Sequence, residues 1–178
     1  MIKILMAKET FKTVDACRAK NDPSRESLQG LNITQKHIEA TDGRMCLRVD
    51  RELVGIPQDA KPGVYKIIGT NKQSAGFIEI ALEIMEGYQF PNVDLVIPEI
   101  SKAADTIAIS ILPPKNEPVN LTTAIIKLFQ HTGNGYSGHL LSKLAGLAES
   151  WSTTKASKDK PIRLDASGYT AVICPFKI

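Results

Sequence analysis

Apolar and polar residues alternate along several short stretches of this chain, and this period of two constrains the fold more than any other feature. The alternation is clearest over Ile78–Met85, where an isoleucine or leucine occupies every second position up to Ile84. Successive side chains of a β-strand point to opposite faces of the sheet, so this run predicts a half-buried strand. Shorter runs of the same kind occur near residues 2–6, 31–33, 45–49, 64–69 and 107–111.

Helical spacing is confined to a few stretches. We expect helices over Lys8–Lys20, Leu121–His131 and Gly138–Trp151, because apolar residues recur there every three or four positions. The order of a strand, a helix and several strands therefore occurs twice along the chain. Strands that are mostly joined by short turns, with few helices, favour an α+β fold with antiparallel sheets over an alternating parallel one.

The length of 178 residues fits one domain of ordinary size or two small ones. We expect a single domain over residues 1–178 with two pseudo-repeated halves, about 1–98 and 99–178, joined by a connection near 90–118. In each half a helix would pack on an antiparallel sheet. The two halves show no close sequence repeat, so this duplication is inferred from the order of the elements alone.

Composition narrows the class of protein. The hydrophobic fraction of 43% and the charged fraction of 23% are in the range of soluble globular proteins. No apolar run is long enough to span a bilayer, and the N-terminus lacks the features of a signal peptide. The three cysteines form no CxxC pair, which favours a reducing compartment over a disulfide framework. We therefore expect a cytoplasmic protein that does not associate with membranes.

A search for catalytic patterns yields one candidate loop. Residues Gly133–Gly138 form GxGxxG before a predicted helix, and such a loop can cradle a phosphate. The dinucleotide-binding motif requires a preceding strand, however, whereas the preceding segment has helical spacing. A loop between two helices is the simpler interpretation, and a nucleotide-binding enzyme remains the less favoured alternative. His131 and His139 flank the loop without a third ligand at metal-site spacing, so we expect no catalytic residue, no metal and no cofactor.

Basic residues form two groups within a formal net charge of only +3. A solvated face accounts for both groups, but lysines spread in this way also suit loose contacts with phosphates that do not depend on base sequence. Nothing in the sequence suggests that bases are read. The groups are Lys8, Lys12, Arg18 and Lys20 in the first half, and Lys143, Lys155, Lys158 and Lys160 in the second.

Three segments carry a resemblance to one family, in that family's chain order. The run ATDGRMCL at 40–47 resembles the A-T-D-G-(H/R)-R-L stretch of the bacterial DNA sliding clamp, the beta subunit of DNA polymerase III. The run GYQFPNVDLVIP at 87–98 resembles the clamp's interdomain stretch, in which G-x-F-P-D is followed by V-(I/L)-P. The terminal run GYTAVICPFKI at 168–178 resembles the clamp's last strand, which ends in M-P-M-R-L.

The resemblance implies a clamp-like fold, with helices lining a DNA hole and antiparallel sheets outside, and a function without catalysis. A clamp tethers a DNA polymerase to duplex DNA as a processivity factor in replication. The basic residues that we carry over as DNA-binding candidates are Lys8, Lys12, Arg18, Lys20, Lys143 and Lys155. The alternative is a clamp-derived interaction module that does not contact DNA.

The resemblance also implies a pocket that captures a short peptide of the polymerase or another clamp-binding partner. The chain departs from the family at Met45, where an arginine is usual, and at two terminal positions where methionines are usual. The candidates for the pocket are Thr41, Gly43, Arg44, Cys46, Cys174, Pro175, Phe176 and Lys177.

Length is the larger departure from the family. A bacterial clamp chain has three domains and closes into a ring as a dimer, whereas this chain has room for about one domain. The two pocket segments would therefore have to meet across a subunit interface, so we expect a homo-oligomer. The segment 113–135 has no counterpart in the clamp pattern.

Overall fold

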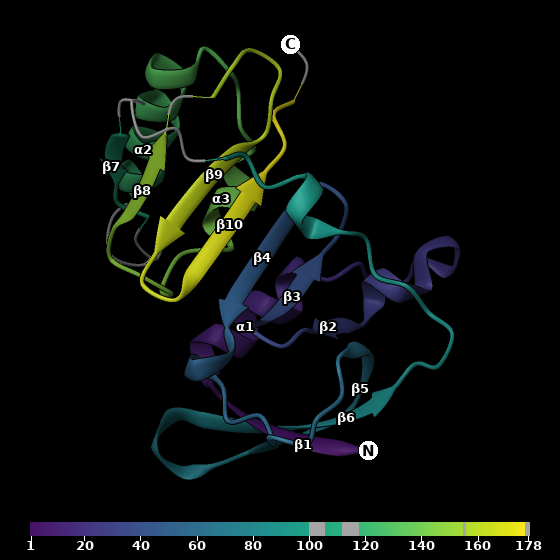
Figure 1. Ribbon diagram of the computed structural model, residues 1–178. Helices are drawn as coiled ribbons and strands as arrows, with labels where there is room; N and C mark the ends of the chain where they lie inside the picture. The colour runs from purple at the N-terminus through teal and green to yellow at the C-terminus, as the bar shows by residue number, and fades with distance from the viewer. Residues whose placement is uncertain (100–105, 112–117, 155, 177–178) are drawn as a thin grey trace. The chain divides into compact units, whose positions relative to one another are not determined.

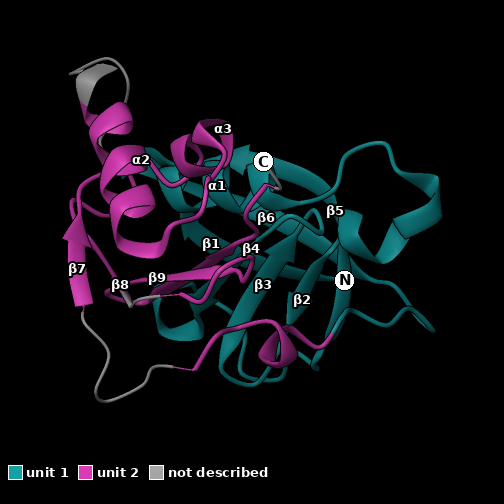
Figure 2. Ribbon diagram, turned by 90° about the horizontal axis from the view of Figure 1, so that it is seen from above, with its two compact units in different colours: residues 1–91 teal, residues 92–178 magenta. Residues whose placement is uncertain are grey.

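The computed structural model describes residues 1–99, 106–111, 118–154 and 156–176. The chain divides into two compact units, residues 1–91 and 92–178 (Figure 2). The boundary between them lies inside the stretch G-Y-Q-F-P-N, within the segment 90–118 in which the sequence suggests a connection. Residues 100–105 and 112–117 of that segment lie outside the described residues.

Unit 1, all of which is described, is an antiparallel sheet with an α-helix packed on it (Figure 1). The strand order across this sheet is β1-β6-β5-β2-β3-β4. A register shift between Ile67 and Gly69 interrupts the pairing of β5 with β6. The elements of unit 1 are β1 (Ile2–Ala7), α1 (Lys8–Cys17), η1 (Pro23–Gln29), β2 (Leu31–Ile33), β3 (His37–Thr41), β4 (Met45–Asp50), η2 (Arg51–Leu53), β5 (Gly63–Lys72), η3 (Ser74–Gly76) and β6 (Phe77–Ile84).

The alternating run in β6 forms the predicted half-buried strand. Ile78, Ile80 and Leu82 are buried, while the residues between them are partly exposed. β6 lies between β1 and β5, pairing antiparallel with both. Burial of one face supplies the hydrophobic stabilisation that holds such a strand in register, because a slip of one residue would expose that face.

Helix α1 packs on β1, β3, β4 and β6 through one face. That face consists of Thr10, Thr13, Val14 and Cys17, which recur with the helical period. The helix ends at Cys17, three residues before the predicted end, because the backbone at Arg18 is extended. The N–H group of Ala19 donates to the carbonyl oxygens of Leu28 (3.0 Å) and Thr41 (3.2 Å), which draws the chain out of the helix.

The strands in the described residues of unit 2 pair antiparallel in the order β7-β8-β9-β10. Helix α2 contacts β7 and α3, so in this unit too a helix packs on an antiparallel sheet. The elements of unit 2 are η4 (Val93–Leu95), β7 (Thr106–Ile109), α2 (Pro118–Thr132), α3 (Gly138–Ser142), β8 (Trp151–Thr154), β9 (Ile162–Ala166) and β10 (Tyr169–Ile173).

The predicted helix over Gly138–Trp151 is wrong beyond its first turn. α3 ends at Ser142, turns follow up to residue 147, and Gly146 has a φ of +90°, which a right-handed helix does not permit. Trp151 instead begins β8 and is fully buried, with its ring centroid 6.3 Å from that of Tyr169. The tryptophan therefore belongs to the core of unit 2.

The two units share an order of elements that matches the expected pseudo-repeat. Each has a strand, helical structure and then three strands that pair consecutively: β1, α1 and β2–β4 in unit 1, and β7, α2, α3 and β8–β10 in unit 2. In unit 2 the first strand pairs directly with the second, whereas in unit 1 the β5–β6 hairpin lies between them. The α+β fold with antiparallel sheets that the sequence predicts is confirmed.

Candidate functional site

The basic residues of α1 lie on the side of the helix away from the sheet. Lys8 and Lys12 are four positions apart, opposite the buried face, and both are exposed. The Nζ atom of Lys12 lies 3.6 Å from a carboxylate oxygen of Glu9, in an exposed pair that water screens. This surface can therefore offer two neighbouring cations to a polyanion.

Asp15 binds the other two cations of this segment. Arg18 donates to its carboxylate through Nε (3.2 Å) and a terminal nitrogen, and Lys20 Nζ lies 2.7 Å from it. Burial acts to raise the pKa of Asp15, but the hydrogen bonds and charges of Arg18 and Lys20 outweigh burial, so its pKa lies below the ordinary value. A third bond from Arg18 reaches the carbonyl oxygen of Gln29. Arg18 and Lys20 are thus partly engaged within unit 1.

The charge available from this segment is smaller than the sequence suggests. The four cations Lys8, Lys12, Arg18 and Lys20 face two carboxylates, Glu9 and Asp15, which leaves 4 − 2 = +2. Arg18 and Lys20 also line an open groove of about 450 Å³, together with Lys66 and the ring of Tyr88. The groove is also lined by Glu26, which accepts from the Tyr88 hydroxyl, so its cations are partly offset by a carboxylate.

The remaining DNA-binding candidates lie in unit 2. Lys143 is half-buried and caps the C-terminus of α3, where its own N–H group donates to the carbonyl oxygen of Leu140 (3.2 Å). A cation at a helix C-terminus interacts favourably with the helix dipole, which is a structural reason for a lysine at this position. Lys155 lies outside the described residues.

The T-D-G segment is a tight turn between β3 and β4. The Thr41 hydroxyl donates to the carbonyl oxygen of Met45 (2.7 Å) and accepts from the Gly43 N–H group (3.0 Å), while Asp42 Oδ1 accepts from the N–H groups of Arg44 and Met45 (both 2.9 Å). Gly43 has a φ of +84°, a conformation that glycine adopts without strain. These hydrogen bonds account for the residues A-T-D-G by their role in the turn, and a binding role is not needed to explain them.

The pocket candidates of this segment differ in accessibility. Gly43 and Arg44 are exposed, whereas Thr41 and Cys46 are buried. Burial raises the pKa of the Cys46 thiol to about 12, with a further contribution from the nearby carboxylate of Glu39. Cys46 is therefore a protonated core side chain, and the turn residues are the accessible part of the segment.

The terminal candidates follow β10. Cys174 is exposed, Pro175 is half-buried, and Phe176 is 53% exposed. The Phe176 N–H group donates to the carbonyl oxygen of Gly135 (3.1 Å), and a Cβ atom at Gly135 would lie 2.8 Å from the phenyl ring. The ring thus rests on the Gly133–Gly138 loop with half of its surface open. Lys177 lies outside the described residues.

The glycines of the GxGxxG loop serve packing. Gly133, with a φ of +71°, ends α2 by donating its N–H group to the carbonyl oxygen of Phe129 (2.8 Å). Gly135 admits the ring of Phe176, and a Cβ atom at Gly138 would lie 3.0 Å from Ile125. The preceding element is a helix, as the spacing predicts, so the strand that a dinucleotide-binding motif requires is absent here.

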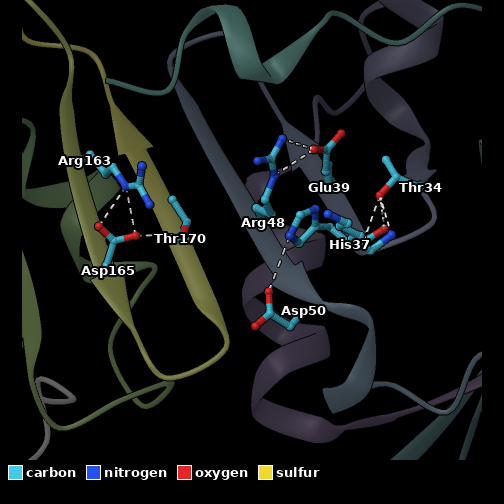
Figure 3. A network of polar contacts seen from close by, with 9 residues as sticks. Thr34, His37, Glu39, Arg48, Asp50, Arg163, Asp165 and Thr170 are labelled. Atoms are coloured by element: carbon cyan, nitrogen blue, oxygen red, sulfur yellow. Dashed lines mark hydrogen bonds and ion pairs between the residues drawn. The ribbon is translucent and has the colours of Figure 1, made fainter. Parts of the chain in front are cut away.

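Two ion-pair networks escaped the sequence analysis (Figure 3). In unit 1 the buried carboxylate of Glu39 accepts from Arg48 (2.6 and 2.9 Å) and from Asn32 (2.7 Å). In unit 2 Asp165 accepts from Arg163 Nε (2.8 Å) and the Thr170 hydroxyl (2.8 Å). Glu39 joins side chains of neighbouring strands, whereas Asp165 joins Arg163 of its own strand to Thr170 of β10. Both networks stabilise the sheet and neither forms a catalytic arrangement.

Among the residues that the structure describes, no group of three histidine, cysteine, aspartate or glutamate side chains is arranged to hold a metal ion. No described helix is long and apolar enough to cross a membrane. An open groove of about 500 Å³ beside α2 and β7 is lined in part by Lys127 and His131.

The chain resembles solved sliding clamps over its whole length. No protein-family model and no curated protein matches it. The structure of DNA polymerase III subunit beta from Borrelia burgdorferi in complex with a natural product has a TM-score of 0.60 and 10% identity, with 100% of this chain and 63% of that chain covered. The DNA polymerase sliding clamp from Pseudomonas aeruginosa has a TM-score of 0.61 and 12% identity, with 99% of this chain and 66% of that chain covered. The DNA polymerase sliding clamp from Bacillus subtilis has a TM-score of 0.60 and 12% identity, with 100% of this chain and 66% of that chain covered.

These likenesses cover nearly the whole of this chain. The chain spans 63–66% of the length of these clamp chains. Because the sequence identities are only 10–12%, these structural similarities establish the fold of the chain. The chain therefore has the fold of the bacterial DNA polymerase III beta sliding clamps, in a shorter form.

Proposed function

We propose that this protein is a sliding-clamp-like accessory factor of DNA replication that binds duplex DNA without sequence preference and tethers a partner there. It has no catalytic role in this proposal and needs no cofactor. The observation that carries the proposal is the clamp fold over the whole chain, combined with Lys8 and Lys12 on the exposed side of α1. A clamp needs sequence-independent contacts, and exposed lysines on a packed helix suit that requirement.

The DNA contacts that we propose come from both units. Lys8 and Lys12 are the leading pair because they are exposed and lie on one helical face. Arg18 and Lys20 contact DNA when a phosphate displaces the carboxylate of Asp15 as their partner. Lys143 and Lys155 complete the proposed set in unit 2.

We also propose that a partner peptide is captured by the T-D-G and terminal segments. The support is an exposed turn at Gly43 and Arg44 and a half-exposed ring at Phe176, because an aromatic side chain suits an apolar anchor of a short peptide. Thr41, Cys46, Cys174, Pro175 and Lys177 complete the candidate set. A peptide of the replicative DNA polymerase is the partner that this hypothesis favours.

A homo-oligomer is part of the same proposal. Strand β7 is at one end of the strand order of unit 2 among the described residues. An edge strand exposes backbone N–H and C=O groups that a strand of a second copy can pair with. Such pairing would extend the antiparallel sheet from one copy to the next, as closure around DNA requires.

One observation favours a second candidate, an interaction module that has lost DNA binding. Lys12, Arg18 and Lys20 are each paired with a carboxylate of the same segment. These pairs reduce the local charge to +2, as calculated above, and weaken the attraction for a polyanion. The two candidates differ in whether the protein has any salt-dependent affinity for duplex DNA.

The deciding experiment is a fluorescence anisotropy titration with a short labelled duplex at several salt concentrations. The double variant Lys8→Gln/Lys12→Gln should reduce the slope of log K against log salt by about two units, at about 0.9 per lost phosphate contact. The control Lys61→Gln/Lys72→Gln removes the same charge before and at the end of β5 and should leave the slope unchanged. Absence of salt-dependent binding by the wild-type protein would favour the interaction module.

A further inference from the structure

Asn134, in the middle of the glycine-rich loop, is a buried polar residue whose side chain makes three hydrogen bonds. It is 4% exposed. Its Nδ2 donates to the carbonyl oxygen of Ser157 (3.1 Å) and to the Tyr136 hydroxyl oxygen (3.3 Å), and its Oδ1 accepts from the Asp159 N–H group (2.9 Å). Two of these three bonds go to backbone atoms of another loop, so Asn134 fixes the position of that loop.

The loop held in this way is a turn at residues 157–160. The N–H group of Lys160 donates to the carbonyl oxygen of Ser157 (3.2 Å), which closes the turn. Asp159 has a φ of +61°, in the left-handed region where a residue other than glycine is strained by roughly 1 kcal/mol or more. The bond from Asn134 to the Asp159 N–H group helps to hold this conformation, so the turn has a defined shape although its side chains are exposed.

The turn presents two lysines that differ from Lys12 of α1 and resemble Lys8. Lys158 and Lys160 are exposed, and neither has an ion pair among the residues that the structure describes. On α1, by contrast, Lys12 is paired with a carboxylate, so a phosphate must compete with that group. Within residues 158–160 Asp159 is the one carboxylate, which leaves a local charge of 2 − 1 = +1 over these three residues.

We propose that the turn 157–160 is a phosphate-contacting element for duplex DNA, in which Lys158 and Lys160 make the contacts and Asn134 is the positioning residue. This inference rests on the proposed function and adds a site to it. A turn that is already ordered before binding loses less conformational entropy on binding than a mobile loop. Asn134 therefore acts through the backbone of the turn and does not touch the DNA.

The test uses the full chain and a short duplex of arbitrary sequence. Lys158→Gln/Lys160→Gln should reduce the salt slope by about two units, at about 0.9 per phosphate contact. A fourfold rise in salt would then weaken the wild-type protein roughly tenfold more than the variant. Lys127→Gln removes an exposed lysine from α2 of the same unit and should leave the slope unchanged.

The role of Asn134 is tested by a double-mutant cycle. Asn134→Ala should weaken DNA binding of the wild-type protein several-fold, but it should have no further effect in the Lys158→Gln/Lys160→Gln background. Its effect on thermal stability should be the same in both backgrounds. Hydrogen exchange of the Asp159 amide should become faster in Asn134→Ala, because the amide loses its acceptor.

Each outcome decides a different question. If the wild-type protein has no salt-dependent affinity for DNA, the proposed function fails and this inference fails with it. If it binds but Lys158→Gln/Lys160→Gln keeps the wild-type slope, the inference is overturned while the proposed function stands. If Asn134→Ala weakens binding equally in both backgrounds, Asn134 has no positioning role. The lysine variant decides the main point even if Asn134→Ala does not fold, because both lysines are exposed.

Discussion

Replacing Asp15 with asparagine removes the carboxylate that holds Arg18 and Lys20. Asparagine keeps the size of the side chain and can still accept a hydrogen bond, but it no longer neutralises a cation. The charge of the α1 segment then rises from +2 to +3, because one of the two carboxylates is lost. The substitution therefore strengthens the positive surface without adding a side chain to it.

The magnitude follows from counterion release. If both freed cations contact phosphates, the slope of log K against log salt steepens by up to about 1.8 units, at about 0.9 per contact. Binding at low salt should then tighten, and the gain should disappear as salt rises. The folded state should lose about 1–2 kcal/mol, because Arg18 is largely buried and its charge-assisted bonds to Asp15 are weakened.

The same variant has a signature in acid. The pKa of Asp15 is held below its ordinary value of 3.8, so the ionised carboxylate stabilises the folded state above that pH. This contribution is lost as the pH falls through the lowered pKa of the folded state. Urea unfolding of Asp15→Asn should therefore depend less on pH below about pH 4 than unfolding of the wild-type protein.

The assay is an anisotropy titration of a labelled duplex at several salt concentrations, with Asp22→Asn as the matched control. Asp22 pairs with Arg25 at 2.6 Å, so the control also frees one arginine of unit 1 and changes the net charge equally. Arg25 is not a DNA-binding candidate, and the slope of the control should remain that of the wild-type protein. Equal slopes in Asp15→Asn and Asp22→Asn would refute the role of Arg18 and Lys20 in phosphate contact.

Three further predictions concern the folded state. Glu39→Ala removes a carboxylate that is 3% exposed from a buried ion pair and should cost about 3 kcal/mol in urea unfolding, whereas Glu79→Ala, in an exposed pair, should cost less than about 1 kcal/mol. A thiol reagent at pH 8 should label the native protein at Cys174 and not at Cys46, whose pKa is raised to about 12, and Cys174→Ser should abolish the labelling. Phe176→Ala should cost about 1 kcal/mol because the ring is 53% exposed, and a cost of ~3–5 kcal/mol would identify it as a core residue.

The strands were predictable where one face is buried and the other is not. The run over Ile78–Met85 shows the alternation because β6 has a buried and a partly exposed face. The helix ends were less predictable, since they depend on tertiary contacts. Nothing local to Arg18 indicates that the N–H group of Ala19 will bond to the carbonyl oxygens of Leu28 and Thr41. The leucine spacing after Gly138 fits both a long helix and a short helix followed by turns. The positive φ of Gly146, which excludes the long helix, is not visible in the spacing.

The candidate site was predictable in part from helical geometry. A period of 3.6 residues places Lys8 and Lys12 on one face, and both are exposed. The pairing of Lys12 with Glu9 and of Arg18 with Asp15 was also readable, because residues three apart are neighbours on a helix surface or just beyond its end. The ion pair of Lys20 with Asp15, five residues away, required the extended backbone after the helix.

The β5–β6 hairpin gives a physical reason for the absence of a visible repeat between the two units. In unit 1 three successive antiparallel pairings lead from β1 through β6 and β5 to β2, so β2 runs opposite to β1. In unit 2 β8 pairs directly with β7 and likewise runs opposite to it. The hairpin therefore inserts two strands without reversing the rest of the sheet. It also widens the surface under the helix: α1 contacts β1 and β6 as well as β3 and β4, whereas α2 contacts β7 and α3. A helix of ten residues with buried threonines at positions 10 and 13 is thus held on one side by the sheet, which leaves the side that bears its lysines free to meet a ligand.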